Sequence, residues 1–281
     1  MTSEILRSEG AKLTLHLDGP TWEGVPSATL GAFNCTTPEA GADLLRRAIA
    51  RTRSAERQRL LAPMDGDTWH SYRFVIETDG SAPFLLEPPD RPVARTALLG
   101  AGFDEVSRYF SARVPLAETA RSAPPESTDF VVTQWDGEAP QALFEQVFDL
   151  SKQAFAENAF YKPISREAFL ALYMPMVPLL KRELIFFARR SDGALAGFLF
   201  GTPNYAEGPA PHTAILKTYA SLIKGAGQHL AHAFHQAALE AGYDTAIHAL
   251  IHDSNLSALR SATEGGQVFR RYALYGLRLD G

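Results

Sequence analysis

Cysteine is almost absent from this 281-residue chain: its single one, Cys35, excludes an internal disulfide and suits a reducing compartment. The first residues lack the apolar stretch of a secretory signal. Long hydrophobic runs are also missing. The most apolar segment, 169–180, is interrupted by Pro175 and Pro178 and is shorter than the roughly 18 residues that a membrane span needs. We therefore expect a cytoplasmic protein without a membrane partner.

A strong excess of charge of one sign is absent as well. The net charge is −5 and 21% of residues are charged, which argues against a general polyanion binder. Arginines gather in a predicted helix over 43–61, but they are spread over several faces without interleaved aromatics, so we expect no nucleic-acid partner. The apolar fraction of 46% excludes wholesale disorder, and the length suits about two domains.

A change in composition divides the chain. The stretch from Pro115 to Asp129 reads PLAETARSAPPESTD, with three prolines and few large apolar groups. It predicts a linker at 116–128 between a domain at 1–115 and a domain at 129–281. The alternative is a long surface loop within one domain.

The second half shows a legible order of elements. Two helices precede a hairpin formed by the apolar runs 183–190 and 194–202 around a Ser-Asp-Gly turn. A strand at 212–220, an amphipathic helix, a strand at 244–251 and a closing strand at 267–279 follow. This order predicts an α+β fold with a mixed α/β sheet, mostly antiparallel and flanked by helices.

The turn between strand 212–220 and the next helix has the features of an anion site. Gly225 and Gly227 let the backbone approach a ligand, the first helical N–H groups are free to donate, and Lys224 adds positive charge. The alternative is a tight turn without a ligand. No P-loop string occurs, and Leu230 stands where a dinucleotide fold needs its third glycine.

The elements from about 130 to 279 resemble those of the GNAT superfamily of acyl-CoA-dependent N-acyltransferases. The pyrophosphate motif of that family, Gln/Arg-x-x-Gly-x-Gly/Ala, falls on residues 222–227, with Leu222 in place of the polar first residue. The resemblance implies acetyl-CoA as acyl donor, no metal, and a cofactor site made of Tyr219, Leu222, Ile223, Lys224, Gly225, Ala226, Gly227, Gln228 and Asn255. It implies acylation of an amine, of a small molecule or peptide. Because Cys35 lies in the other half and no Ser–His–Asp order surrounds the glycine turn, we expect direct transfer without a covalent acyl-enzyme. The alternative is a non-catalytic acyl-CoA-binding or partner-binding module.

Amine acylation needs a base, and histidine has a suitable pKa. On strand 244–251 and just beyond it, His248 and His252 are expected on one face, with His252 nearer the cleft as the base and His248 beside the substrate. Both residues also suit structural roles. The tyrosine that serves as general acid in many family members would fall near Ala262, so Ser261, Tyr272 or Tyr275 is the candidate substitute.

Three aromatic residues are candidates for the acceptor site. Phe160 and Tyr161 lie in the connection between the two early helices, which borders the acceptor in the family, and Trp69 belongs to an aromatic segment of the first half. Each of them suits plain packing as well. On the helix after the glycine turn, His229, His232 and His235 recur every third residue, and we expect a solvated face rather than a metal site.

The first half is expected to be a degenerate GNAT-like domain. Segment 97–114 reads as a helix end, a Gly-Phe step and a closing strand, as at the end of many GNAT domains. Residues 39–41 stand where the glycine turn would be, before the predicted helix at 43–61. The carboxylate of Glu39 would repel a pyrophosphate there, so we expect no cofactor in this half.

Overall fold

A computed structural model describes residues 3–121, 123–124 and 129–279, and the chain forms two compact units. Unit 1 comprises Met1–Phe110, Asn158–Lys162 and Arg270–Gly281, and unit 2 comprises Ser111–Glu157 and Pro163–Phe269. Strands β7 (Asp104–Pro115) and β13 (Gln267–Arg278) each run from one unit into the other. The units thus depart from the linear division at 115 and 129, because most of the last strand is counted with unit 1.

The expected linker at 116–128 does not begin as solvated chain. Its first residues form the short helix α3 (Leu116–Thr119), and Leu116 is fully buried in the core of unit 2. The backbone N–H of Leu116 donates to the carbonyl of Asp244 at 2.9 Å. Residues 122 and 125–128 of the expected linker lie outside the described residues.

The sheet of unit 1 has the strand order β1-β2-β4-β5-β13, with β4 and β5 parallel and the other neighbours antiparallel. Its strands are β1 (Ser3–Ser8), β2 (Ala11–His16), β4 (Val25–Cys35) and β5 (Arg59–Ala62), while β3 (Thr21–Trp22) pairs with β4 and β6 (Phe74–Thr78) pairs with β13. Alternation along β2 sends Leu13 and Leu15 into the core, where both are fully buried.

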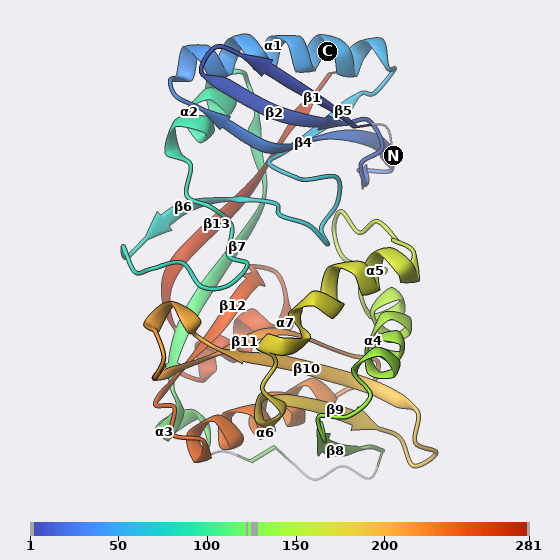
Figure 1. The fold of residues 1–281 in the computed structure, drawn as a ribbon, viewed down its shortest axis with the longest axis vertical. Coiled ribbons are helices and arrows are strands. Elements are labelled where there is room, and N and C mark those ends of the chain that lie inside the picture. The colour runs from blue at the N-terminus through green and yellow to red at the C-terminus, as the bar shows by residue number, and fades with distance from the viewer. Residues whose placement is uncertain (1–2, 122, 125–128, 280–281) are drawn as a thin grey trace. The chain divides into compact units, whose positions relative to one another are not determined.

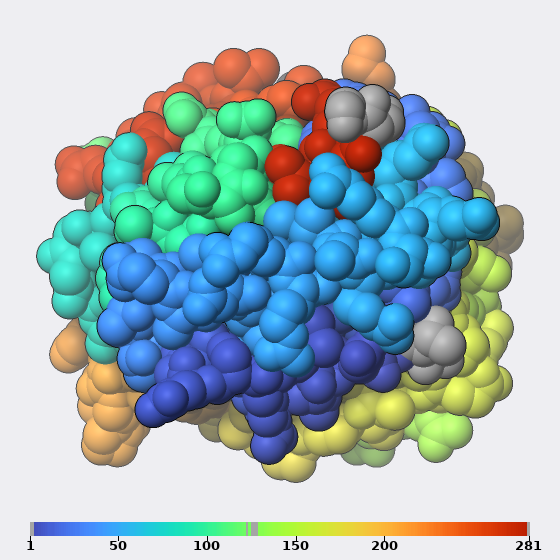
Figure 2. Space-filling view, turned by 90° about the horizontal axis from the view of Figure 1, so that it is seen from above, coloured from blue at the N-terminus to red at the C-terminus, as the bar shows by residue number. Residues whose placement is uncertain are grey.

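Helices α1 (Pro38–Ser54) and α2 (Pro92–Gly100) complete the core of unit 1 through Leu44, Leu45 and Leu98. The outer side of α1 lies open on the molecular surface (Figure 2). The helix predicted at 43–61 begins earlier and ends at Ser54. Its expected last residues form β5 instead, where Leu60 and Leu61 are both buried, and a short apolar run of this kind fits a buried strand as well as a helix.

Unit 2 has the sheet order β12-β11-β10-β9-β8, in which only β11 and β12 are parallel among the described strands. The strands are β8 (Val131–Gln134), β9 (Ile185–Arg189), β10 (Leu195–Pro203), β11 (Thr213–Ser221) and β12 (Thr245–His252). The predicted hairpin is therefore confirmed as β9 and β10, and the mixed, mostly antiparallel sheet is confirmed with it.

Helices cover both faces of this sheet (Figure 1). The helices are α4 (Pro140–Ala154), α5 (Arg166–Tyr173), α6 (Ala226–Glu240) and α7 (Leu256–Thr263), with short 3-10 turns η1 (Met174–Leu179), η2 (Arg182–Leu184) and η3 (Tyr205–Glu207). Phe200 stacks on Phe144 of α4 at 5.5 Å, whereas the next residue, Gly201, packs against Phe234 of α6. Neighbouring strand residues point to opposite faces, so α4 and α6 lie on opposite sides.

Candidate functional site

The parallel strands of unit 2 separate toward their carboxyl ends. β11 and β12 pair from Thr213 with Thr245 to Leu216 with His248, and no further pair joins them among the described residues. At this point β11 carries a bulge, since Leu216 pairs with Gly201 and Thr218 with Phe200, which leaves Lys217 as the extra residue. Beyond Leu216, β11 continues to Ser221 and the glycine turn without a further pair to β12 in the described chain.

The glycine turn opens directly into α6 without a side-chain cap. Gly225 is the N-cap, with φ of 88°, and a Cβ there would meet nothing within 4 Å. Within the described chain, the N–H groups of Ile223, Lys224 and Gly227 donate to no backbone carbonyl. Such free donors at the positive end of a helix form an anion site. The predicted cofactor residues 222–228 are thus brought together at one open helix end.

Arg260 is a residue at this turn that the sequence reasoning missed. An added Cβ on Gly227 would lie 3.1 Å from a guanidinium nitrogen of Arg260 and 3.2 Å from the ring of Tyr219. Burial raises the pKa of Tyr219, opposed by the charge of Arg260 and by hydrogen bonds from Ser257 and Arg260. The side chains of Arg260 and Tyr219 thus pack closely on Gly227, and Arg260 brings positive charge beside the helix start. Its position five residues after Asn255, on α7, was the only sequence signal.

Asn255 and His252 flank the start of α7. Asn255 is exposed at the N-cap position of that helix, and its side chain makes no capping hydrogen bond. The Nδ1 atom of His252 accepts the backbone N–H of Ser254 at 3.1 Å and lies 2.8 Å from the Ser254 hydroxyl. Accepting at Nδ1 places the proton of the neutral ring on Nε2. His252 can act as a base only when this turn opens, so its catalytic role stays a prediction.

His248 lies in a buried polar cluster rather than on an open strand face. Its Nε2 atom is 2.9 Å from Nε2 of His235 and 3.7 Å from a carboxylate oxygen of Glu264, and its Nδ1 atom is 3.1 Å from the hydroxyl of Ser261. His235, His248 and Ser261 are 1%, 5% and 1% exposed. The residue at 250 has φ of 57°, which interrupts the alternation expected along β12. Ser261 is buried against His248, whereas a general acid must be accessible to the substrate.

The cluster corrects the expectation of a solvated histidine face on α6. That helix packs on both the sheet and α3, so its buried face is wide enough to include His235. Burial lowers the pKa of His248 to about 4, and burial with the neighbouring His248 lowers that of His235 to about 3. Burial raises the pKa of Glu264 to about 7 against the charge of Arg260. Both imidazoles are neutral at pH 7, and each keeps one lone pair.

The remaining candidates belong to unit 1. The indole N–H of Trp69 donates to the carbonyl of Lys162 at 2.8 Å, and its ring lies 6.1 Å from that of Tyr161. Phe160 packs against the core around Trp22. Trp69 and Tyr161 are thus in contact, whereas Phe160 belongs to the neighbouring apolar cluster, and the role of all three at an acceptor site stays a prediction.

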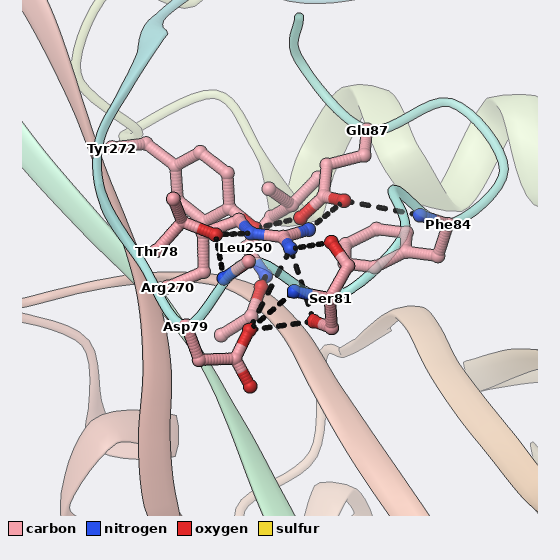
Figure 3. Close-up of polar contacts among 10 residues, drawn as sticks. Thr78, Asp79, Ser81, Phe84, Glu87, Leu250, Arg270 and Tyr272 are labelled. Carbon is pink, nitrogen blue, oxygen red and sulfur yellow. Dashed lines mark hydrogen bonds and ion pairs between the residues drawn. The ribbon is translucent and has the colours of Figure 1, made fainter. Parts of the chain in front are cut away.

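Tyr272 belongs to a buried polar network of unit 1 around Arg270 (Figure 3). Its hydroxyl donates to the carboxylate of Glu87, which also binds the guanidinium of Arg270. Arg270 donates further to Ser81 and Thr78, and the side chains of Arg270 and Glu87 are 4% and 0% exposed. Tyr272 is thus fully buried and its proton is committed to Glu87, which fits a structural role.

The start of α1 is closed where that of α6 is open. The hydroxyl of Thr37 accepts the N–H of Ala40 at 3.2 Å, Pro38 has no N–H, and Glu39 adds a negative charge in the first turn. Residues 39–41 lie inside this helix, not before it as the sequence predicted. The described part of unit 1 shows no uncapped glycine turn at this position.

No protein-family description and no curated protein matches this sequence. Solved structures match it along nearly its whole length. One is a tandem GNAT protein from the clavulanic acid biosynthesis pathway, at 15% identity and a TM-score of 0.55, covering 99% of this chain and 82% of that one. Another is a GCN5-related N-acetyltransferase from Sphaerobacter thermophilus, at 12% identity and 0.56, covering 96% and 77%. The predicted tandem GNAT fold is therefore confirmed.

A third match has the same fold in a longer chain. A GCN5-related N-acetyltransferase from Anabaena variabilis superposes at a TM-score of 0.57 with 10% identity, and 98% of this chain covers 62% of that one. At such identities the likeness shows the fold alone. Separately, no helix in the described part of this chain has the length and hydropathy to span a bilayer.

Proposed function

We propose that unit 2 binds acetyl-CoA and transfers its acyl group to the amine of a small molecule or peptide. The observation that supports this most strongly is the coincidence of two features at one place. An uncapped helix start with free N–H groups follows β11, and the parallel partner of β11 has separated from it just before that turn. In acetyl-CoA, the pyrophosphate is an anion that suits the helix start, and the extended arm attached to it suits the edge of β11.

The residues of unit 2 divide the task of holding the acyl donor. The turn at 222–228 and the charges of Lys224 and Arg260 would bind the pyrophosphate, and the open edge of β11 offers backbone groups to the extended arm. Acetyl-CoA supplies an activated acyl group when bound. Asn255, exposed at the start of α7, is the further polar group that we place beside it.

Direct transfer is the mechanism that fits the available nucleophiles. Cys35, the only cysteine, is buried in unit 1, and burial raises the pKa of its thiol, which suppresses the reactive thiolate. Rate would then come from holding the amine next to the thioester. We retain His252 as the proposed base, acting when its bond to Ser254 opens.

A non-catalytic acyl-CoA-binding module is the second candidate, and specific contacts favour it. Ser261 is enclosed in the histidine cluster and Tyr272 is bound to Glu87, so neither proposed acid is exposed. The two candidates share the cofactor site and differ only in turnover.

Calorimetry with acetyl-CoA tests the shared site through Gly225→Glu. A carboxylate at this turn would face the pyrophosphate, and two like charges about 4 Å apart near a protein surface repel by roughly 4 kcal/mol, so binding should weaken by two to three orders of magnitude. Gly193→Glu is the matched control. Gly193 also has a positive φ, 84° against 88°, and open space around it, but it lies in the β9–β10 turn.

The control should bind acetyl-CoA like the wild type. Equal affinity in Gly225→Glu and Gly193→Glu would reject the proposed cofactor site. Thiol release from acetyl-CoA with a panel of amines then separates the two candidates. Turnover that falls in His252→Ala at unchanged acetyl-CoA affinity supports the enzyme, whereas binding without turnover across the panel supports the module.

A further inference from the structure

Three potential metal ligands converge in the interior of unit 2 from three separate elements. His235 comes from the inner face of α6, His248 from β12, and Glu264 from the residue that ends α7. One ligand atom of each lies within 4.8 Å of the other two, and the two Nε2 atoms are 2.9 Å apart. Their separation in sequence explains why no spacing motif announces them.

A hydrogen bond between the two imidazoles accounts for only part of this arrangement. One ring can donate to the other, but the carboxylate of Glu264 then faces the same point at 3.7 Å from His248 Nε2 without a role in that bond. The ring planes of His235 and His248 make an angle of 27°, and the ring centroids are 5.1 Å apart. Two nitrogens and one oxygen therefore lie within 4.8 Å of one another in the interior of unit 2.

The donor set, more than the present spacing, points to zinc. Zinc–nitrogen bonds of about 2.0 Å place two nitrogens on a tetrahedral ion roughly 3.3 Å apart. On binding, the two Nε2 atoms, now 2.9 Å apart, would separate slightly, and the carboxylate of Glu264, now 3.7 Å from His248 Nε2, would move closer. Two imidazoles and one carboxylate are a donor set for zinc, whereas magnesium and calcium prefer oxygen alone.

Ser261 supplies the outer support that metal-bound histidines need. Its hydroxyl lies 3.1 Å from Nδ1 of His248, on the side of the ring opposite the cluster, and it is 1% exposed. When Nδ1–H donates to this oxygen, the lone pair of Nε2 is directed toward the other ligands. The serine thus acts as a positioning residue for His248.

We propose that His235, His248 and Glu264 bind one zinc ion, which ties α6, β12 and α7 together. The site is distinct from the glycine turn and does not depend on the proposed acyl transfer. Its consequence is local: α7 carries Arg260 and Asn255, so an ion at its end holds that helix beside the start of α6. The ion leaves one coordination position for water.

Titration of the full chain with CoCl₂ after treatment with a chelator tests this site directly. Tetrahedral Co²⁺ has intense visible absorption bands, so the wild type should develop them at one ion per chain and lose them on addition of ZnCl₂. Glu264→Gln and His235→Gln should weaken binding by roughly 100-fold or more, and Ser261→Ala by about 10–100-fold, as for other outer-shell partners. Zinc should also raise the thermal midpoint of the wild type.

His229→Gln is the matched control, because His229 lies on the same helix but packs against Phe130 with ring centroids 5.0 Å apart. It should bind Co²⁺ like the wild type. The circular dichroism spectrum checks folding, and the half-buried Glu264→Gln is the variant least prone to misfold. Absence of tetrahedral bands in the folded wild type, or equal binding by the folded Glu264→Gln variant, would overturn the proposal.

Discussion

The two helices that follow a central strand, α1 in unit 1 and α6 in unit 2, start in opposite ways. In α1, the side chain of Thr37, the ring of Pro38 and the carboxylate of Glu39 close the first turn. In α6, Gly225 has no side chain to cap the helix, and in the first turn the N–H of Gly227 donates to no backbone carbonyl of the described chain. The two halves thus begin corresponding helices in different ways, and the anion site that we propose needs the uncapped start of α6.

The glycines near the two helix starts show the same difference. A Cβ on Gly41 would lie 2.7 Å from Cβ of Ala97 and 2.8 Å from Sγ of Cys35, so this glycine allows α1 to pack closely. A Cβ on Gly225 would meet nothing, and its positive φ shapes the turn. Gly41, inside the first turn of α1, thus serves packing, whereas Gly225, at the N-cap of α6, leaves open space before its helix.

The largest effect that we expect concerns the buried ion pair of unit 1. Arg270→Met leaves the carboxylate of Glu87 buried without its cation, which should lower the free energy of unfolding by about 3–5 kcal/mol. Chemical denaturation followed by circular dichroism measures this, and calorimetry on the folded protein should show unchanged acetyl-CoA affinity. If the acetyl-CoA affinity of folded Arg270→Met fell as well, the proposal that unit 2 alone binds the cofactor would be contradicted.

Arg271→Met is the control for this prediction. The neighbouring Arg271 pairs with Glu77 at 3.3 Å, but both side chains are exposed, at 38% and 68%. Solvent screens such a pair, so its loss should cost about 0–1 kcal/mol. Equal destabilisation by both variants would show that burial of Arg270 is not the cause.

Gly41→Ala should have an intermediate effect, because its methyl group would overlap Ala97 and Cys35. Overpacking of this kind lowers the free energy of unfolding by about 1–3 kcal/mol. Gly100→Ala serves as the reference, since Gly100 is also helical in unit 1 but has open space around it. Denaturation midpoints should fall for the first variant and stay level or rise for the second. A neutral Gly41→Ala would remove the packing explanation.

Thr37→Ala should have the smallest effect, a loss of about 1 kcal/mol, because the N–H of Ala40 loses its acceptor. Thr37→Ser keeps the oxygen and should retain most of the stability in the same denaturation measurement. Acetyl-CoA binding should not change in either variant, since Glu39 still repels an anion from this helix. If Thr37→Ala bound a second acetyl-CoA, Pro38 and Glu39 alone would not be enough to keep an anion from the start of α1, contrary to our interpretation.

Local patterns were sufficient for many elements and for the glycine turn. Ser165 caps α5 by accepting the N–H of Ala168, as its position before an apolar repeat predicts. Gly193 marks the turn of the β9–β10 hairpin, and Gly225 marks the start of α6. Each of these features is decided within about five residues of chain, where the allowed backbone angles and hydrogen-bond partners are local properties.

The tertiary structure alone decided which distant residues meet. Residues 59–62 form a strand because β4 and β13 pair with them, although the local pattern fitted a helix. Likewise, His235 was expected to face solvent, yet packing on two sides of α6 buries it opposite His248 and Glu264. The sequence by itself determined most of the elements and the glycine turn. Burial and long-range pairing, which arise only when the elements pack, decided the strand at 59–62, the histidine cluster and the burial of Tyr272 against Glu87.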